Sequence, residues 1–345
     1  MIAAKTEFGT IDGRTVYAYT LKNSKGMEVT AVEYGCAITK ILAPDRNGKL
    51  ENVVLGCDSL EDYRNKVPYF GAVVGRVAGR IRSGDLPVGA EAFKVTANQE
   101  GHHLHGGESG FTHKIWGSRP LEDQNGVEFT YHSPDGEEGF PGNLEVKVTY
   151  ILSEENELTL SYSGESDQDT VLNMTNHTYF NLSGNVKEDI GEHELTVPSA
   201  HYLELDSDSL PTGNKRRTEG TVFDFRKGRK LGEGFRSEDE QIAIAGGGYD
   251  HPFLLDEGRE MVLYHEKSGR LLHAETDQPS VILYSSNAMG EDIVLQEGIK
   301  ARKHCAVCLE TQHPPDAVHH EGFPSVLLKK GETYHAYAKW KFTSK

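Results

Sequence analysis

Apolar and polar residues alternate along much of this chain with a period of two, which is the pattern of a strand with one buried face. Three segments show it most clearly, namely residues 144–150, 157–163 and 335–342. The apolar positions of these segments are Leu144, Val146, Val148, Tyr150, Leu158, Leu160, Tyr162, Ala336, Ala338, Trp340 and Phe342. The sequence therefore predicts strands there, each with one face in a core.

Turn signals separate the alternating segments. They are dipeptides in which glycine supplies a positive φ, namely Asp12-Gly13, Asn47-Gly48, Asn125-Gly126, Asp135-Gly136 and Ser268-Gly269. Helical patterns are short, as in residues 59–65, and 37 glycines disfavour long helices. So many strands must pack sheet on sheet or close into a barrel. We therefore expect an all-β fold, a large antiparallel β-sandwich or barrel.

Length and charge narrow the possible classes of protein. No linker, repeat or change of composition divides the 345 residues, so we expect one domain over 1–345. The net charge of −17 opposes binding to nucleic acid and to anionic membranes. The sequence has no signal-like segment and no apolar run long enough to span a bilayer, and its four cysteines are too few for a disulfide framework. These features favour a cytoplasmic protein, a monomer or homodimer, that acts on a neutral or cationic small molecule.

The segment NQEGHHLHGG, residues 98–107, raises a choice between metal binding and proton transfer. Neighbouring residues of a strand point to opposite faces, so His103 and His105 could share a side that His102 could not. No zinc-binding motif, nucleophile elbow or phosphate-binding loop is found. Cys305 and Cys308 have C-x-x-C spacing, but they lie in a strand-like segment and are expected to be inert. The sequence thus favours acid–base chemistry on an uncharged molecule, with no cofactor and no metal.

Five motifs, taken in order, resemble those of the aldose 1-epimerase (galactose mutarotase) family. They are GRVAGRI at 75–81, HHLHGG at 102–107, NHTYFNL at 176–182, GYDH at 248–251 and LETQHPPDAV at 309–318. The similarity also extends to EYGCAITKILAPDRNG near the start and PSVLLKKGETYHAYAKWKF near the end. The resemblance implies a large antiparallel β-sandwich with an open active-site cleft on one sheet, and interconversion of the α and β anomers of free aldoses such as galactose and glucose.

The resemblance also implies roles for individual residues. Glu310 would be the general base, His177 the general acid, and His105 a second histidine near the ring oxygen. The sugar-binding residues would be Arg80, Asp250, Gly79 and Asn176. An ionised Glu310 close to His177 would raise the pKa of the histidine and lower its own. The acidic limb of the pH profile would then belong to Glu310 and the alkaline limb to His177.

This chain departs from the family pattern at two places. Gly79 stands where many members have asparagine, which puts one hydrogen bond to the sugar in doubt. His102-His103 replaces the more usual pair before Leu-His, and we interpret both as ordinary loop residues. Trp116, Tyr179 or Phe140 could offer a ring face to the sugar, although core packing is the expected role of any one of them.

Three alternative functions remain open at this point. A glycoside hydrolase could use Asp250 and Glu310 as paired carboxylates. A hexose 6-phosphate epimerase would need a local basic pocket, from Arg76, Arg82 or the run 215–217, although we expect that run to be a solvated loop. A sugar-binding protein could keep the fold without catalysis.

Overall fold

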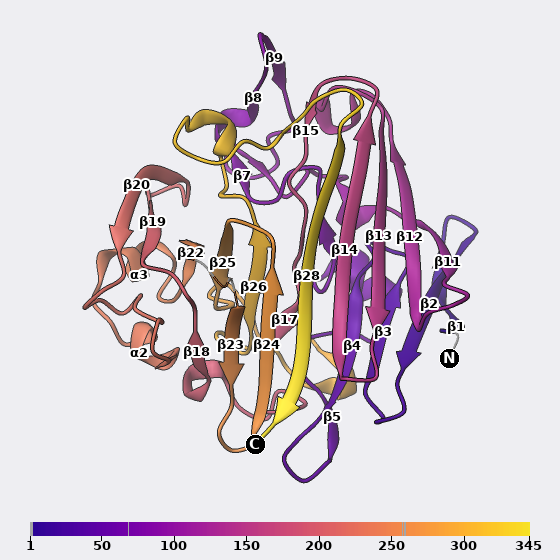
Figure 1. The fold of residues 1–345 in the computed structure, drawn as a ribbon, viewed down its shortest axis with the longest axis vertical. Helices are drawn as coiled ribbons and strands as arrows, with labels where there is room; N and C mark the ends of the chain where they lie inside the picture. The colour runs from indigo at the N-terminus through magenta and orange to yellow at the C-terminus, as the bar shows by residue number, and fades with distance from the viewer. Residues whose placement is uncertain (1–2, 68, 257, 259) are drawn as a thin grey trace.

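Three antiparallel sheets dominate the computed structural model, which describes residues 3–67, 69–256, 258 and 260–345 (Figure 1). The largest sheet has nine strands and holds all three segments with the clearest alternation. In spatial order its strands are β11 (Gly117–Pro120), β12 (Gly126–Ser133), β13 (Leu144–Leu152), β14 (Glu157–Ser166), β28 (Thr333–Ser344), β24 (Arg270–Thr276), β23 (Glu260–Tyr264), β18 (Glu194–Thr196) and β21 (Arg229–Lys230).

The second sheet is an N-terminal meander of five strands. They are β1 (Ala4–Ile11), β2 (Arg14–Lys22), β3 (Glu28–Val32), β4 (Ile38–Pro44) and β5 (Leu50–Asn52). The Asp12-Gly13 turn joins β1 to β2 with positive φ at both residues, as predicted. The expected positive φ fails at Gly126, which instead begins β12 in an extended conformation.

The third sheet has six strands and carries the cavity described below. In order they are β17 (Tyr179–Phe180), β26 (Val307–Gln312), β25 (Ser280–Tyr284), β22 (Asp250–Leu254), β19 (His201–Leu205) and β20 (Pro211–Arg217). Residues 215–217, expected in a loop, lie instead on the edge strand β20, where Arg216 forms an ion pair with Glu204. Charged side chains on an edge strand oppose pairing with another sheet.

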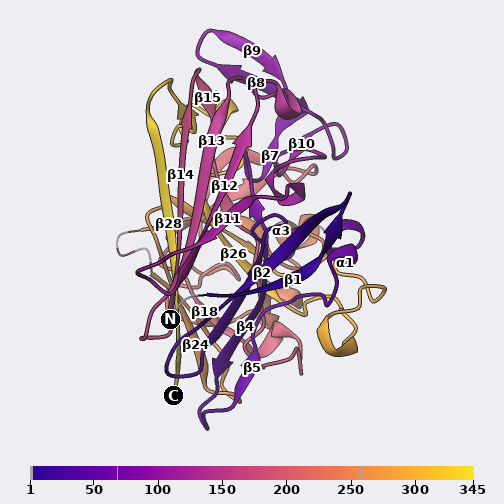
Figure 2. The ribbon, with the colours of Figure 1, turned by 90° about the vertical axis from the view of Figure 1, so that its right-hand side faces the viewer.

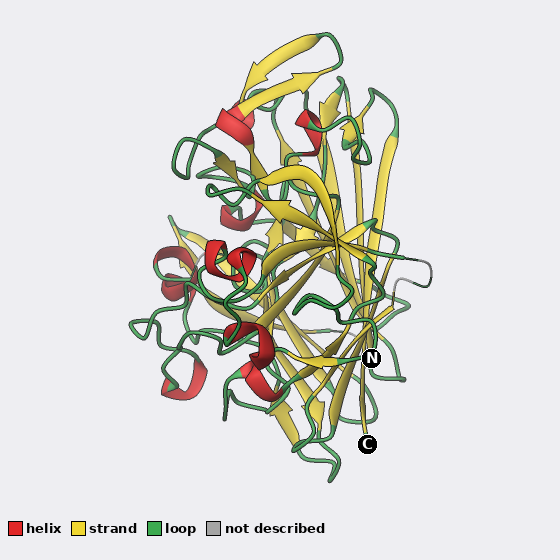
Figure 3. Ribbon diagram, turned by 90° about the vertical axis from the view of Figure 1, so that its left-hand side faces the viewer, coloured by secondary structure: helices red, strands yellow, loops and turns green. Residues whose placement is uncertain are grey.

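Short strand pairs and helices complete the fold. The pairs are β7 (Arg80–Ile81) with β10 (His103–Leu104), β6 (Val73–Val74) with β16 (Thr175–Asn176), β8 (Asp85–Val88) with β9 (Glu91–Lys94), and β15 (Thr170–Val171) with β27 (Leu327–Leu328). The α-helices are α1 (Leu60–Asn65), α2 (Gly232–Phe235) and α3 (Glu240–Ile244), and six single turns of 3₁₀-helix occur at Arg82–Gly84, Phe111–His113, Glu137–Gly139, Ile190–Glu192, Gln296–Gly298 and Ala317–His319. Figure 3 shows these helices in the connections between strands.

The helix expected at 59–65 is α1, which begins after Ser59. The Ser59 hydroxyl accepts a hydrogen bond from the backbone N–H of Asp62, as an N-cap residue does. Among the described residues, no helix is long and apolar enough to cross a membrane.

The nine-stranded sheet packs against both of the other large sheets, as the side view in Figure 2 shows. Tyr19 of β2 meets Phe129 of β12 edge to face, with ring centroids 6.1 Å apart. Trp340 of β28 meets Phe180 of β17 in the same way at 4.9 Å. The predicted inward positions of β13, β14 and β28 are buried. The expected antiparallel sandwich is thus confirmed, with the five- and six-stranded sheets forming its second layer.

Candidate active site

The outer face of the six-stranded sheet forms the floor of a cavity of about 390 Å³. Along β26, Val307 and Leu309 join the core, whereas Glu310 and Gln312 line the cavity. The neighbouring strands alternate in the same way, and their cavity-lining residues are Tyr179, Asp250, Pro252, Ile282 and Tyr284. Because successive side chains of a strand point to opposite faces, one face of each strand packs in the core and the other lines the cavity.

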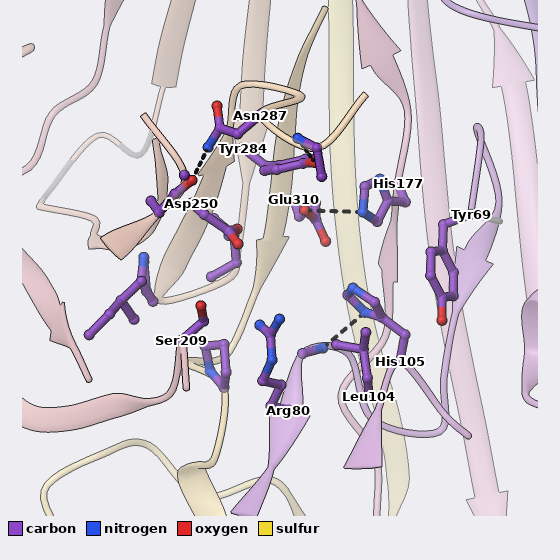
Figure 4. Close-up of a pocket in the computed structure, with 18 of the residues that line it drawn as sticks. Tyr69, Arg80, Leu104, His105, His177, Ser209, Asp250, Tyr284, Asn287 and Glu310 are labelled. Atoms are coloured by element: carbon purple, nitrogen blue, oxygen red, sulfur yellow. Dashed lines mark hydrogen bonds and ion pairs between the residues drawn. The ribbon is translucent and has the colours of Figure 1, made fainter. Parts of the chain in front are cut away.

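Glu310 and His177 face each other at the bottom of this cavity (Figure 4). His177 lies between β16 and β17, and its Nε2 is 3.6 Å from Oε1 of Glu310. The other ring nitrogen, Nδ1, is 3.5 Å from the thiol sulfur of Cys308. The imidazole stacks on Tyr179 with ring centroids 4.9 Å apart. Both side chains are almost fully buried, so packing fixes their orientation.

His105 follows directly after β10, and Figure 4 shows its ring beside Glu310 and His177. Its backbone has φ of +51°, so the strand alternation that relates His103 to its neighbours ends there. Nδ1 of His105 accepts a hydrogen bond of 3.1 Å from the backbone N–H of Gly79. The His105 and His177 rings lie edge to face with centroids 5.4 Å apart.

Arg80 and Asp250 complete the polar lining. Arg80 begins β7, and β7 pairs with β10 so that Arg80 lies opposite Leu104, next to His105. Among the described residues, no hydrogen bond or ion pair engages the Arg80 guanidinium. Asp250 begins β22, opposite Tyr284 of β25. No hydrogen bond from another described residue engages either side chain, so their donors and acceptors are available to a polar molecule.

Burial governs the protonation of these groups. It lowers the pKa of His177 to about 4. Burial, together with the Asp250 carboxylate, raises the pKa of Glu310 well above its ordinary value, although Arg80 acts against this. The expectation that ion pairing would raise the pKa of His177 and lower that of Glu310 is therefore wrong, because losing water costs both ions more than their attraction returns.

The pair nevertheless supplies one acid and one base. Because burial favours the neutral forms of both groups, the pair carries one proton, on Glu310, at pH values between the two pKa values. Two groups that share one proton form a donor and an acceptor whichever of them carries it. The arrangement can therefore remove a proton from one oxygen of a bound molecule and deliver one to another.

Six of the seven predicted site residues lie together on this cavity, and Asn176 does not. The cavity lining includes Glu310, His177, His105, Arg80, Asp250 and Gly79. The Asn176 amide instead donates to the Gly71 carbonyl and the Tyr150 hydroxyl, and its oxygen accepts from Thr178. Asn176 thus holds the backbone that carries His177 and does not reach the cavity.

Gly79 allows a close approach between two chain segments. It has φ of +80°, and a Cβ at this position would lie 2.8 Å from two carbon atoms of the Pro315 ring. Pro315 therefore occupies space that a side chain at position 79 would need, so no side-chain hydrogen bond from this position is available to a sugar.

Other candidate residues prove structural. His102 and His103 are both outside the cavity lining, but His103 is buried on β10 against Phe140 and is not the loop residue we expected. Trp116 and Phe140 are core residues, which leaves Tyr179 as the one of the three proposed aromatic residues that lines the cavity.

The basic residues considered for a phosphate site are engaged elsewhere. Arg76 is buried and donates to the carbonyl groups of residues 133, 134, 141 and 142. Arg82 forms an ion pair with Asp206. Among the described residues that line the cavity, Arg80 is the one lysine or arginine, and the Asp250 carboxylate there opposes a dianion.

Sequence reasoning missed several lining residues. Tyr69, whose ring lies 4.7 Å from that of His105, comes from a segment without any pattern. Gln312 belongs to the LETQ motif, and its Oε1 is buried without a hydrogen-bond partner among the described residues. Cys308, expected to be inert, contacts His177. The strand alternation that places Glu310 on the outer face places Gln312 and Cys308 there too.

His105, His177 and Glu310 could also be read as metal ligands. One ligand atom of each lies within 4.8 Å of those of the other two. Two histidines and a carboxylate form a zinc-binding set in some enzymes. The distances between these atoms fit both proton transfer and metal binding. The hydrogen bond from the backbone N–H of Gly79 to His105 Nδ1 distinguishes the two uses.

Comparison with known proteins gives one consistent family. A sequence model described as aldose 1-epimerase matches residues 17–340. The chain is 41% identical to a galactose mutarotase from Rattus norvegicus over 98% of each chain, and 34% identical to an aldose 1-epimerase from Haemophilus influenzae over 98% of this chain and 99% of that one. Among solved structures, a galactose 1-epimerase from Lactobacillus acidophilus has a TM-score of 0.89 at 31% identity, over 99% of this chain and 98% of that one.

Proposed function

Because the chain belongs to the aldose 1-epimerase family and is a mutarotase, we propose that Glu310 and His177 open and reclose the ring of a free aldose in this cavity. The observation that carries the proposal is the 3.6 Å approach of the Glu310 carboxyl group and the His177 imidazole at the cavity floor.

The reaction needs two proton transfers and no redox step. Glu310 takes the proton of the anomeric hydroxyl while His177 gives a proton to the ring oxygen, and the bond between C1 and the ring oxygen breaks. Rotation about C1–C2 presents the other face of the aldehyde. The ring oxygen then attacks C1 as both protons return, so the pair ends as it began.

Substrate binding prepares the pair for this step. Polar hydroxyls and the Arg80 guanidinium replace lost water around Glu310, which favours the ionised carboxylate. The proton of the pair then resides on His177. Arg80 and Asp250 fix the sugar by directional hydrogen bonds. Holding C1 in the correct position next to Glu310 and His177 accounts for much of the remaining rate enhancement.

We propose galactose and glucose as substrates. The relatives named for galactose support the first, and the cavity supports a neutral sugar, because the Asp250 carboxylate offsets the charge of its arginine. A free anomeric hydroxyl is required, since Glu310 must remove its proton. Methyl α-galactoside, which lacks that proton, should stay intact, and its cleavage would instead indicate a glycoside hydrolase.

The first prediction concerns the base. Glu310→Gln keeps the shape of the side chain and removes the base, so mutarotation should fall by about 10²-fold or more. Polarimetry of fresh α-galactose, with the uncatalysed rate subtracted, measures this. Glu275→Gln, which changes an exposed carboxylate of β24, is the matched control and should leave the rate unchanged. Activity of Glu310→Gln above about a tenth of wild type would contradict the assignment, because a positioned base is worth ~10²-fold or more.

We also propose a cytoplasmic location, a monomer or homodimer, and no nucleic-acid partner. Four buried free cysteines support a reducing compartment. The net charge of −17 supports the absence of a nucleic-acid partner.

A further inference from the structure

Gly79 and His105 are joined by two hydrogen bonds. The backbone N–H of His105 donates to the Gly79 carbonyl at 3.0 Å. The backbone N–H of Gly79 donates to Nδ1 of the His105 ring at 3.1 Å. Gly79 is buried, and Pro315 packs where its side chain would be, so neither end of this contact can easily move.

The second hydrogen bond specifies where the ring proton lies. A ring nitrogen can accept a hydrogen bond from a backbone N–H only if that nitrogen carries no hydrogen. A neutral His105 must therefore hold its proton on Nε2, and Figure 4 shows this second nitrogen on the side of Glu310 and His177. Burial, aided by the positive charge on Arg80, lowers the pKa of His105 well below its ordinary value. The ring is thus neutral around pH 7.

We propose that the backbone N–H of Gly79 is a positioning group that makes His105 a neutral Nε2–H donor to a sugar oxygen and keeps a divalent metal out of the site. This inference rests on the proposed function for the identity of the ligand. It assigns His105 a hydrogen bond and no proton transfer, because a neutral imidazole held in this tautomer is a poor acid.

The same contact opposes metal binding by the cluster of His105, His177 and Glu310. A metal would need the lone pair of His105 Nε2, which requires the ring proton to move to Nδ1. Two N–H groups would then face each other at the Gly79 contact, and a buried donor would lose its acceptor. Without His105, only one histidine and one carboxylate remain, which is fewer than the three protein ligands of a catalytic zinc site.

Nuclear magnetic resonance of the ¹⁵N-histidine-labelled wild-type protein tests the tautomer directly. The expected result is an unprotonated Nδ1 and a protonated Nε2 for His105, unchanged between pH 6 and pH 8. A protonated Nδ1, or a ring that becomes charged in this range, would overturn the proposal. The measurement needs no sugar, so it can fail while the assignment of Glu310 and His177 stands, and the reverse also holds.

Two substitutions separate the two nitrogens. His105→Gln places an amide N–H close to the position of Nε2, whereas His105→Asn places an oxygen close to Nδ1 and nothing in the cavity. If donation to the sugar is the function, His105→Gln should keep kcat within about tenfold of wild type, and His105→Asn should lose about 10²-fold. Equal losses would show that the donor alone does not explain His105. Thermal melting checks that both variants fold.

Zinc titration tests the exclusion of metal. Calorimetry of the wild-type protein with zinc chloride should give no stoichiometric binding that galactose displaces, and dialysis against EDTA should leave activity unchanged. Tight one-to-one binding that is lost in both Glu310→Gln and His105→Asn would overturn this part of the proposal.

Discussion

At the scale of single residues, the site shows how burial can reverse an argument from charge. Glu310 is 3% exposed and His177 is 4% exposed, and both favour their neutral forms. Attraction between ions is strong in a nonpolar interior, but desolvation of two ions costs more unless other groups compensate. In the proposed mechanism the bound sugar supplies that compensation, so the ionised pair forms when the substrate is in place.

The protonation of Glu310 and His177 determines the pH dependence of kcat/KM, which reports the free enzyme. Below pH about 4, His177 becomes protonated while Glu310 is still protonated, so the pair has no base and activity falls. At the raised pKa of Glu310, the pair loses its last proton and activity falls again. The limbs thus belong to the opposite residues from those that the sequence alone suggested.

His177→Asn tests whether the alkaline limb belongs to Glu310, because the slope of activity against pH should change sign in this variant. In this variant Glu310 acts alone and must be ionised, and the causes that raise its pKa remain. Residual activity should therefore rise with pH over the range in which wild-type activity falls, as measured by polarimetry across pH. A variant that retains the descending alkaline limb would show that the last proton does not reside on Glu310.

At the scale of elements, β26 serves the core with one face and the cavity with the other. Leu309 is buried in the core between the layers, and Glu310 next to it faces the cavity. Neighbouring positions of one strand should therefore respond to substitution in opposite ways.

We expect Leu309→Ala to lower the free energy of unfolding by about 2–5 kcal/mol, because it leaves a cavity in a close-packed core. Its kcat should remain near that of wild type at temperatures where the variant is folded. Glu310→Gln, the matched change on the other face, should alter stability by less than about 1 kcal/mol, since the buried acid favours its neutral form. Urea unfolding measures both, and equal destabilisation would contradict the division of faces.

The sequence predicts the elements of the outer layer well and those of the site less well, for a physical reason. Alternation identifies β13 and β28 because each has one face in water. All six residues of β26 are buried, so its pattern does not reveal which face carries Glu310. The family motifs supply that information. They do not show that Asn176 turns away from the cavity or that His105 follows a strand with positive φ, because both depend on contacts distant in sequence.

At the scale of the whole molecule, one core connects the two ends of the chain. The largest cluster of buried apolar residues extends from Ala3 to Phe342 and includes residues of all three large sheets. We propose on this basis that the chain is a single domain. The six-stranded sheet, which carries the site, then shares its stability with the strands that pack behind it.

The positions of the two tryptophans give this core an optical consequence. Trp116 and Trp340 are 0% and 1% exposed, and neither lines the cavity. Their fluorescence should be blue-shifted and should not change when galactose binds. In urea both should move to longer wavelength in one transition, since each lies in the shared core. A change of emission on addition of sugar, or two separate unfolding transitions, would contradict this expectation. Intrinsic fluorescence should therefore report folding of this protein and should not report substrate binding.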